Sequence, residues 1–371
     1  MNLLNTEGPL SRIELTKKSK LDGKTVTSLT KELIGENLIS SIGYKSSTGG
    51  RCPELLNINA NARQCIGLYM DGEKILAILS NLKGNILIKR QFPLKVGASR
   101  KTVIDVFEKS ILSLTEQAEH SKLLGIGIAV QGIMDAKMET VIQSALFPSM
   151  EGMNLKKILR KIYSAPVEIE DSARSKALAE KWFGAAKKID NFILLDMGLG
   201  IGCAIFAEGH IHYGENMSSG ELGHTIIDER GTLCRCGHRG CLETVASLEV
   251  LERRIKKELG LKSTNLGEII ELLNKENATA KDIVCEVGHY IGLSISNVVN
   301  VIHPSHIILD GLLTRLGNIF FNSIDETLKH YTMPSFYNNL KLVPAKLGDE
   351  GASLGATTLL LRKIFEMEEL M

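Results

Sequence analysis

Residues 191–214 read NFILLDMGLGIGCAIFAEGHIHYG, and the earlier residues 64–92 read QCIGLYMDGEKILAILSNLKGNILIKRQF. Both stretches begin with an apolar run, turn at glycine and continue into a second apolar run, which is the pattern of an antiparallel hairpin. A repeated opening of this kind predicts a duplicated α/β architecture with two lobes and a cleft between them.

The segments between and after the two hairpins alternate in type. Helical periodicity is found within residues 101–119, 154–163, 248–273, 280–301 and 352–365, and strand-like apolar runs lie at residues 124–130, 166–170 and 306–311. Strands that alternate with helices are typical of an α/β fold.

The composition is that of an ordinary globular chain. Its 371 residues are enough for two or three domains, and 44% of them are hydrophobic. The 44 Lys and Arg residues nearly balance the 43 Asp and Glu residues, so the formal net charge is +1. This balance excludes a polybasic, histone-like protein, and any nucleic-acid binding must come from a local patch.

Neither a membrane span nor secretion is expected. No run approaches 18 consecutive apolar residues, and the N-terminal MNLLNTEGPLSR has an acid and a Gly-Pro pair where a signal peptide has a basic start and an apolar stretch. The chain has seven cysteines, three of which lie within residues 234–241. An odd number with such crowding favours a metal site in the reducing cytoplasm over disulfides.

The first 60 residues carry a helix-turn-helix pattern. Ser11 and Glu14 are spaced as a capping box that starts one helix, and Asp22 can cap a second helix over residues 25–39. We expect the apolar positions of this second helix to face a core: Val26, Leu29, Leu33 and Leu38. Two helices joined by a tight turn are typical of DNA-binding domains, although a helical interaction module shares the pattern.

Side chains suited to phosphates and base edges occupy the opposite face of the second helix: Lys24, Thr25, Thr27, Ser28 and Lys31. Residues 39–59 follow as two strand-like runs around a Ser- and Gly-rich loop, which predicts a wing. Arg51 at its tip would reach the DNA backbone or minor groove, with Gly49-Gly50 permitting close approach. The segment has eight cations and six acids, so specific binding would need a dimer on two half-sites.

The strongest local motif is the cluster of Cys234, Cys236 and Cys241. Three thiolates so close together, with Gly237 and Gly240 permitting a tight backbone, match the ligands of a tetrahedral zinc ion. Spacing alone leaves four candidates for the fourth ligand: His238, His224, His210 and His212. Four protein ligands would make the site structural, because no position stays open for water.

Three carboxylates lie where a polyhydroxylated ligand could bind. Glu221 and Glu243 flank the cysteine cluster, and Asp171 follows a strand-like run. Glutamates of this kind are by default exposed surface residues. The ends of strands at a lobe junction, however, are where open α/β sheets bind ligands.

These motifs together resemble the ROK family, which comprises sugar kinases and sugar-responsive transcriptional regulators. The resemblance rests on SRIELTKKSKLDGKTVTSLTKELI, TGGRCP, GIAVQG, ALAE, DMGLGIG, SGELGH, GTLCRCGHRGCLE and HPSHIILDG. It implies an actin-like, ribonuclease H-like duplicated fold preceded by a winged helix-turn-helix. It also implies a structural zinc on His224, Cys234, Cys236 and Cys241, and a sugar site made of the following residues: Gly132, Asp171, Ser172, Glu221, His224 and Glu243.

We accordingly predict three segments. Residues 1–60 would form the winged helix-turn-helix DNA-binding domain. Residues 61–175, completed by a C-terminal helix at 352–371, would form the first α/β lobe. Residues 176–351 would form the second lobe, with the zinc site and a dimerisation surface.

Several positions depart from the kinase branch of the family. Kinases have an Asp-x-Gly-Gly-Thr phosphate hairpin, whereas residues 69–73 read YMDGE and direct two acids toward the phosphates, which they would repel. Leu199 replaces a threonine of the second phosphate loop. Aligned on ALAE, Ser172 stands at the catalytic-base position, where a hydroxyl cannot take the proton; a slip of one residue would give Asp171 that role.

The sequence therefore predicts a sugar-responsive transcriptional repressor whose kinase-like sensor is catalytically inactive. Its partners would be operator DNA, a sugar or sugar phosphate effector, and further copies of the chain in a homodimer or homotetramer. It would be cytoplasmic. The alternative is an ATP-dependent hexose or amino-sugar kinase with an extra N-terminal domain, and a regulator controlled by a protein partner shares the same motifs.

Overall fold

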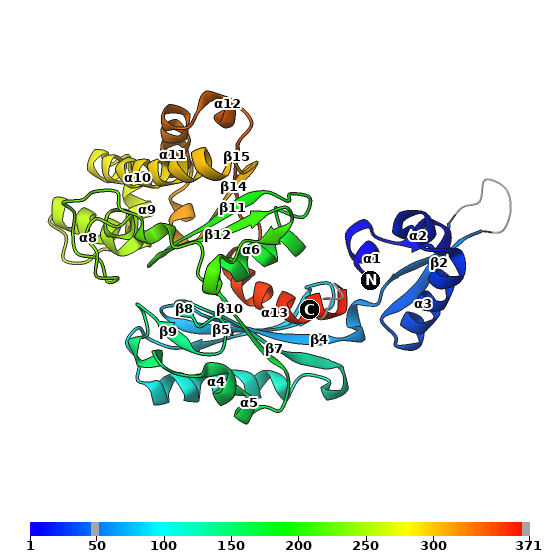
Figure 1. The fold of residues 1–371 in the computed structure, drawn as a ribbon. Helices are drawn as coiled ribbons and strands as arrows, with labels where there is room; N and C mark the ends of the chain where they lie inside the picture. The colour runs from blue at the N-terminus through cyan, green and yellow to red at the C-terminus, as the bar shows by residue number, and fades with distance from the viewer. Residues whose placement is uncertain (46–51, 366–371) are drawn as a thin grey trace. The chain divides into compact units, whose positions relative to one another are not determined.

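The computed structural model describes residues 1–45 and 52–365 (Figure 1). The chain divides into two compact units. The first unit comprises residues 1–130, 154–170 and 356–371, and the second comprises residues 131–153 and 171–355.

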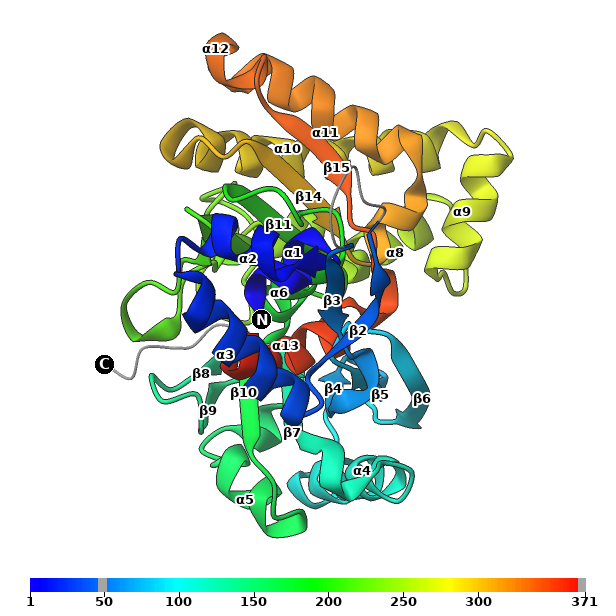
Figure 2. The same ribbon diagram turned by 90° about the vertical axis from the view of Figure 1, so that its right-hand side faces the viewer.

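The first unit begins with a winged helix-turn-helix (Figure 2). Its helices are α1 (Asn2–Glu7), α2 (Arg12–Ser19) and α3 (Gly23–Gly35), and its strands are β1 (Leu10–Ser11), β2 (Ile39–Tyr44) and β3 (Glu54–Ile58), in the sheet order β1-β3-β2. The predicted helix starts are confirmed. Ser11 and Glu14 form a complete capping box on α2, and the carboxylate of Asp22 accepts the backbone N–H groups of Lys24 and Thr25 on α3.

The predicted second helix over residues 25–39 ends earlier, because α3 stops at Gly35 and the buried Leu38 lies beyond it, and its core also differs at Leu29. Leu29 is 44% exposed, whereas Thr30 is buried in its place beside Val26. The reason is a polar contact: the Arg12 Nε donates to the Thr30 hydroxyl at 2.9 Å, so a threonine is satisfied at a core position. Arg51 and the Gly49-Gly50 pair of the predicted wing lie outside the described residues.

The rest of the first unit is built on a five-stranded sheet in the order β10-β7-β4-β5-β6. Its strands are β4 (Gln64–Met70), β5 (Lys74–Asn81), β6 (Ile86–Pro93), β7 (Leu123–Val130) and β10 (Val167–Asp171). Helices α4 (Arg100–Thr115) and α5 (Leu155–Ile162) cover one face, and the end of α13 (Gly351–Phe365) covers the other (Figure 1). A side chain at Gly127 would collide with the carbonyl of Ala356, so glycine permits this close packing.

A second five-stranded sheet, in the order β13-β12-β11-β14-β15, forms the centre of the second unit. Its strands are β11 (Phe192–Met197), β12 (Ile201–Ala207), β13 (His210–Ile211), β14 (His306–Asp310) and β15 (Lys341–Pro344). β11 pairs antiparallel with β12 and parallel with β14, as β4 pairs antiparallel with β5 and parallel with β7. The predicted duplicated α/β fold is therefore confirmed.

Helices bury the apolar faces of the second sheet. They are α6 (Ser172–Phe183), α7 (Glu243–Ala246), α8 (Leu248–Glu258), α9 (Leu266–Asn274), α10 (Ala278–Ile302), α11 (Asn318–Tyr331) and α12 (Pro334–Tyr337), and a short hairpin is formed by β8 (Ile133–Met134) and β9 (Val141–Gln143). α10 and α11 lie side by side (Figures 1 and 2) and share a core with β11 and β14 that includes Leu195, Ile291, Leu309 and Phe320.

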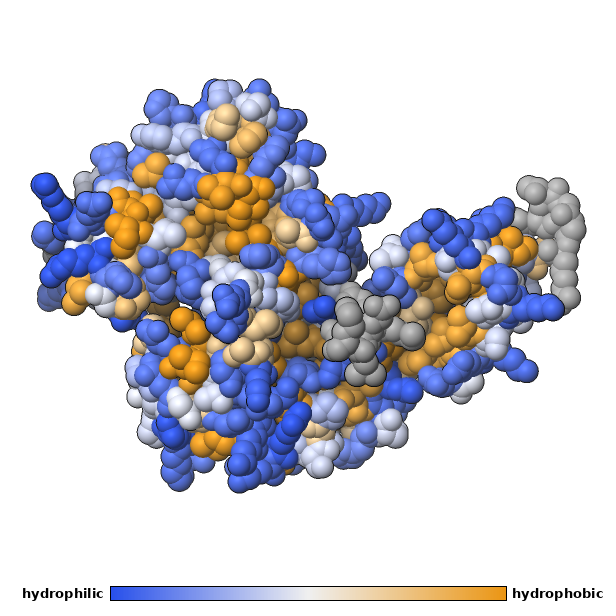
Figure 3. Space-filling view, in the orientation of Figure 1, coloured by the Kyte–Doolittle hydropathy of each residue, from blue (hydrophilic) through white to orange (hydrophobic). Residues whose placement is uncertain are grey.

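The visible surface is mainly hydrophilic, with separate apolar patches (Figure 3). Within residues 1–45 and 52–365, no helix is both long enough and apolar enough to cross a bilayer.

Candidate functional site

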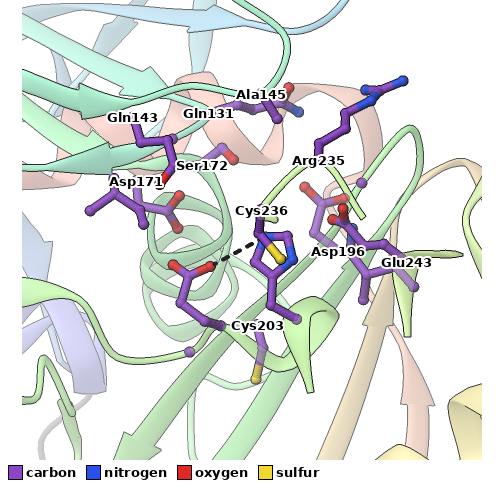
Figure 4. Close-up of a pocket in the computed structure, with 18 of the residues that line it drawn as sticks. Gln131, Gln143, Ala145, Asp171, Ser172, Asp196, Cys203, Arg235, Cys236 and Glu243 are labelled. Carbon is purple, nitrogen blue, oxygen red and sulfur yellow. Dashed lines mark hydrogen bonds and ion pairs between the residues drawn. The ribbon is translucent and has the colours of Figure 1, made fainter. Parts of the chain in front are cut away.

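A cavity of about 370 Å³ opens in the second unit, and every residue that lines it belongs to that unit (Figure 4). The six residues assigned to a sugar site by resemblance all line this cavity, although they come from segments far apart in the sequence: Gly132, Asp171, Ser172, Glu221, His224 and Glu243. The structure thus brings the predicted residues together around one space, large enough for a small polar molecule.

One wall is made where β10 passes into α6. Asp171 ends the strand and caps the helix, because its Oδ1 accepts the backbone N–H groups of Ala173 at 2.9 Å and Arg174 at 3.1 Å. Ser172 is the first residue of α6 and is buried. Gly132 has φ +137°, and a Cβ there would collide with the carbonyl of Gln143, so this bend of the wall requires glycine.

The opposite wall carries Glu221, His224 and Glu243. Glu243 opens α7, and its Oε1 accepts the backbone N–H of Ile201 at 2.7 Å, which fixes the glycine loop before β12. Glu221 Oε2 lies 3.9 Å from His224 Nε2. Burial raises the pKa of Glu221, and the nearby His224 and Arg174 oppose that shift.

A cluster of metal-ligand side chains adjoins this wall. His224, Cys234, Cys236 and Cys241 each offer one ligand atom, and these atoms all lie within 4.8 Å of one another. Cys234 Sγ is 3.6 Å from His224 Nδ1, and Cys236 Sγ is 3.5 Å from Cys241 Sγ. Two thiolates bound to one tetrahedral zinc at 2.3 Å would be about 3.8 Å apart, so the donor set can hold such an ion.

His224 is the histidine that the structure brings to this cluster, in agreement with the resemblance. Of the other candidates, His238 has its Nδ1 3.6 Å from Cys236 Sγ but is not one of the four clustered ligands. His210 lies on β13 and His212 directly follows that strand. The His224 ring has two roles, because Nδ1 faces Cys234 while Nε2 faces Glu221 in the cavity wall. One imidazole therefore joins the cluster to the cavity.

The loop that carries the cysteines is closed by a glycine. Gly240 has φ +71°, and a Cβ there would collide with the carbonyl of Asp228. Backbone hydrogen bonds from Cys234 to His238 and from Gly240 to Thr232 complete the turn. Burial raises the pKa of the Cys236 thiol, but hydrogen bonds with His238, Cys241 and Cys234 together lower it to about 6. The pKa values of Cys234 and Cys241 are raised, so Cys236 is the thiol of this cluster that loses its proton first.

Residues 65–363 match the sequence profile of the ROK family. The chain belongs to the ROK family. Over 378 aligned positions it is 30% identical to a xylose repressor of Caldicellulosiruptor bescii, and the alignment covers 97% of this chain and 94% of that protein. The predicted family is therefore confirmed.

Solved structures agree with this membership. A ROK family transcriptional regulator, described as a homolog of the Escherichia coli MLC protein, superposes with a TM-score of 0.85 at 25% identity and covers 98% of this chain and 94% of its own. A ROK family glucokinase from Streptomyces griseus shares the fold with a TM-score of 0.73 at 22% identity, covering 80% of this chain and 98% of its own.

An internal ion cluster lies beneath the glycine loop of this ROK chain. The ammonium of Lys176 on α6 is 2.6 Å from Asp196 Oδ1 and 3.6 Å from Asp310 Oδ2. All three side chains are buried, and burial raises the pKa of Asp310 to about 6. Asp196 also lines the cavity, so the buried ammonium of Lys176 balances a negative charge in the cavity wall.

The first hairpin differs from the expectation that both of its acids face the place where phosphates would bind. Asp71 turns back into the hairpin, where its Oδ1 accepts the backbone N–H groups of Glu73 at 2.7 Å and Lys74 at 2.8 Å. The reason is the local preference of aspartate for an Asx turn. The Asp71 carboxylate thereby takes the hydrogen bonds of two N–H groups that could otherwise donate to a phosphate. Glu73 stays exposed.

Sequence reasoning missed several residues of the cavity wall, among them Gln131, Gln143, Arg235 and His238. Gln131 directly follows β7, so the end of that strand was a usable signal. Gln143 and Arg235 lie on a short hairpin and on the cysteine loop, and no local pattern marks them. Arg235 is also paired with Glu249 at 2.5 Å.

Proposed function

We propose that this chain is a sugar-responsive, DNA-binding transcriptional repressor. The observation that carries the proposal is the presence, in one chain, of a winged helix-turn-helix and a cavity lined with hydrogen-bonding side chains. The relative from Caldicellulosiruptor bescii, a xylose repressor, supports the same function because the likeness extends through the N-terminal segment.

DNA recognition is assigned to the exposed face of α3. Lys24, Thr25, Thr27, Ser28 and Lys31 are all exposed, as a recognition helix in the major groove requires. Arg51, which lies outside the described residues, would contact the DNA backbone or the minor groove from the predicted wing. Because the segment carries few excess cations, a dimer on an inverted repeat would supply the affinity.

The cavity is assigned to a sugar or sugar phosphate. Acceptors for the hydroxyl groups of the ligand would come from Asp171, Glu221 and Glu243, and Ser172 would supply a hydroxyl group. His224 lines the cavity and also belongs to the metal-ligand cluster. Zinc on His224, Cys234, Cys236 and Cys241 would supply a fixed, closed tetrahedral site, which orders the loop but offers no open position. Ligand binding that alters this wall would change DNA affinity through a coupling of about 1–3 kcal/mol.

The competing function is an ATP-dependent sugar kinase. Aligned on ALAE, Ser172 stands where a kinase needs its base, with Asp171 in that place if the alignment slips by one, and Leu199 replaces a threonine of the phosphate loop. Asp71 occupies the amides of its own hairpin, and Lys176 pairs with Asp196 beneath the second loop. These features favour a regulator that turns over no ATP.

The test uses the full-length chain and DNA selected from genomic fragments. We expect a specific complex in gel-shift titrations, and a shift in its affinity of 5- to 150-fold with one member of a panel of monosaccharides and their phosphates. Arg51→Ala should weaken DNA binding and leave sugar binding intact. Glu243→Ala should weaken sugar binding and leave DNA binding intact. Arg315→Ala, at an exposed ion pair with Asp349, is the control that should change neither.

Two outcomes would contradict the proposal. A chain that forms no specific DNA complex, with or without any sugar of the panel, is not this regulator. Turnover near one per second with ATP, magnesium and any hexose or amino sugar would support the kinase instead.

A further inference from the structure

The two threonines on the exposed face of α3 use their hydroxyl protons in hydrogen bonds within the start of the helix. Thr25 Oγ1 donates to Asp22 Oδ2 at 2.5 Å, and Thr27 Oγ1 donates to the carbonyl of Gly23 at 2.7 Å. A threonine hydroxyl has only one proton to donate. Neither threonine can therefore donate to a base edge without giving up a bond that it makes within the helix.

Each hydroxyl oxygen can still accept a hydrogen bond, and the methyl group is the part of each threonine that can make a new apolar contact. Both residues are exposed, and they lie on either side of the row formed by Lys24, Ser28 and Lys31 on the helix surface. Leu29 is also 44% exposed on the side of Thr25. The groove-facing surface of α3 thus combines a cationic row with apolar groups along its margins.

The sequence of α3 lacks three of the four side chains that make the usual bidentate contacts to guanine and adenine. Residues 23–35 read GKTVTSLTKELIG and have no arginine, asparagine or glutamine. The two amides read adenine, so bidentate readout of adenine is missing from this helix, and guanine could be read only by the lysines Lys24 and Lys31. The apolar group that a helix can recognise in the major groove is the C5-methyl of thymine.

We propose that Thr25 and Thr27 read thymine methyl groups, so that each operator half-site carries thymines opposite the N-terminal half of α3. This inference rests on the proposed DNA-binding function and specifies its chemistry. Lys24 and Lys31 would supply the sequence-independent attraction to phosphates. The methyl contacts would then supply discrimination between T·A pairs and pairs that lack the methyl group.

The experiment replaces thymines of the selected operator one at a time by deoxyuridine, which differs only in lacking the C5-methyl. Affinities are measured by fluorescence anisotropy with the full-length wild-type chain. At the contacted positions we expect a loss of about fourfold for each methyl, equivalent to about 0.8 kcal/mol. Thymines elsewhere in the duplex should give no change.

Matched variants assign the effect to residues. Thr25→Ser and Thr27→Ser keep the hydroxyl and remove the methyl, so each should bind the thymine and deoxyuridine operators equally at its own position. Thr25→Val keeps a methyl in place and should keep the discrimination. Thr16→Ser is the control, because Thr16 on α2 makes a similar bond to the carbonyl of Arg12 at 2.8 Å and lies off the recognition face.

Three results would overturn the inference. The first is an operator whose affinity is unchanged by every deoxyuridine substitution. The second is a deoxyuridine effect that persists in both serine variants. Each would leave the regulator function standing, since a specific complex had formed. The third is the lack of any specific operator, which would end both proposals together.

Discussion

The N-terminal segment and the second unit use ion pairs in opposite ways. In the N-terminal segment, Arg12 pairs with Glu54 and Lys45 with Glu14, and these side chains are between 30% and 55% exposed. In the second unit, the cluster of Lys176, Asp196 and Asp310 lies in the interior, with side chains at most 11% exposed. The ion pairs of the N-terminal segment are therefore exposed to solvent, whereas the ion cluster of the second unit is buried.

The difference sets how each region should respond to a change. Exposed pairs contribute little because water screens the charges, and their loss costs below about 1 kcal/mol. Removing one partner of a buried pair leaves a charge without compensation and costs several times more. Damage to the cavity region should therefore be severe, while the DNA-binding segment should tolerate the loss of single charges.

The largest effect is expected at the metal cluster. Cys236→Ser leaves an incomplete ligand set, so metal content measured by mass spectrometry should fall from one zinc per chain to near zero. Structural zinc contributes to folding, and the melting temperature should fall with it. Cys285→Ser, at a half-buried thiol outside the cluster, is the control that should keep the zinc. Wild-type protein with intact thiols and no zinc would refute the prediction.

The next effect is expected at the buried ion cluster. Lys176→Met leaves Asp196 and Asp310 without their cation, and the free energy of unfolding should fall by about 3–5 kcal/mol in urea titrations. Lys181→Met is the matched control on the same helix, because Lys181 pairs with the exposed Asp190 at 2.6 Å, and it should cost below about 1 kcal/mol. Equal losses in the two variants would remove the contrast between the regions.

The sequence allowed more of the fold to be predicted than of the cavity. Caps such as Ser11 and Asp22 act within a few residues, and hairpins such as β4–β5 and β11–β12 show their alternation and turns directly. The spacing of the cysteines predicted the metal cluster, but four histidines were equally good candidates for its fourth ligand. Only the resemblance to a family selected His224, because the choice depends on how a distant segment folds back.

The residues that were missed depend on contacts across long sequence distances. Lys176 and Asp310 meet although 134 positions separate them, and nothing near either residue marks the partner. Thr30 is buried where Leu29 was expected for the same reason, because Arg12 on another helix donates a hydrogen bond to the threonine hydroxyl. Periodicity assigns a face of a helix, but a polar partner from elsewhere can override one position of it.

The smallest effect, and the one with a distinctive pH dependence, is expected at Glu14. Hydrogen bonds from Lys45 and from Ser11 lower the pKa of this carboxyl to about 2, against an ordinary value of 4.5. Because the folded state binds the proton less readily than the unfolded state, the stabilisation is complete above pH 4.5 and is lost as pH falls toward 2. The protection factors of the α2 amides, which correct the exchange rates for their intrinsic pH dependence, should therefore fall between these values in the wild type.

Glu14→Gln should remove this pH dependence, because the amide does not titrate, and should leave α2 slightly less protected at neutral pH. Glu7→Gln is the control: Glu7 pairs with Lys18 at 2.5 Å with similar exposure but takes no part in a capping box. Its exchange profile between pH 4.5 and 2 should follow the wild type. An unchanged profile in Glu14→Gln would mean that the capping box and its bond to Lys45 do not stabilise the start of the helix-turn-helix.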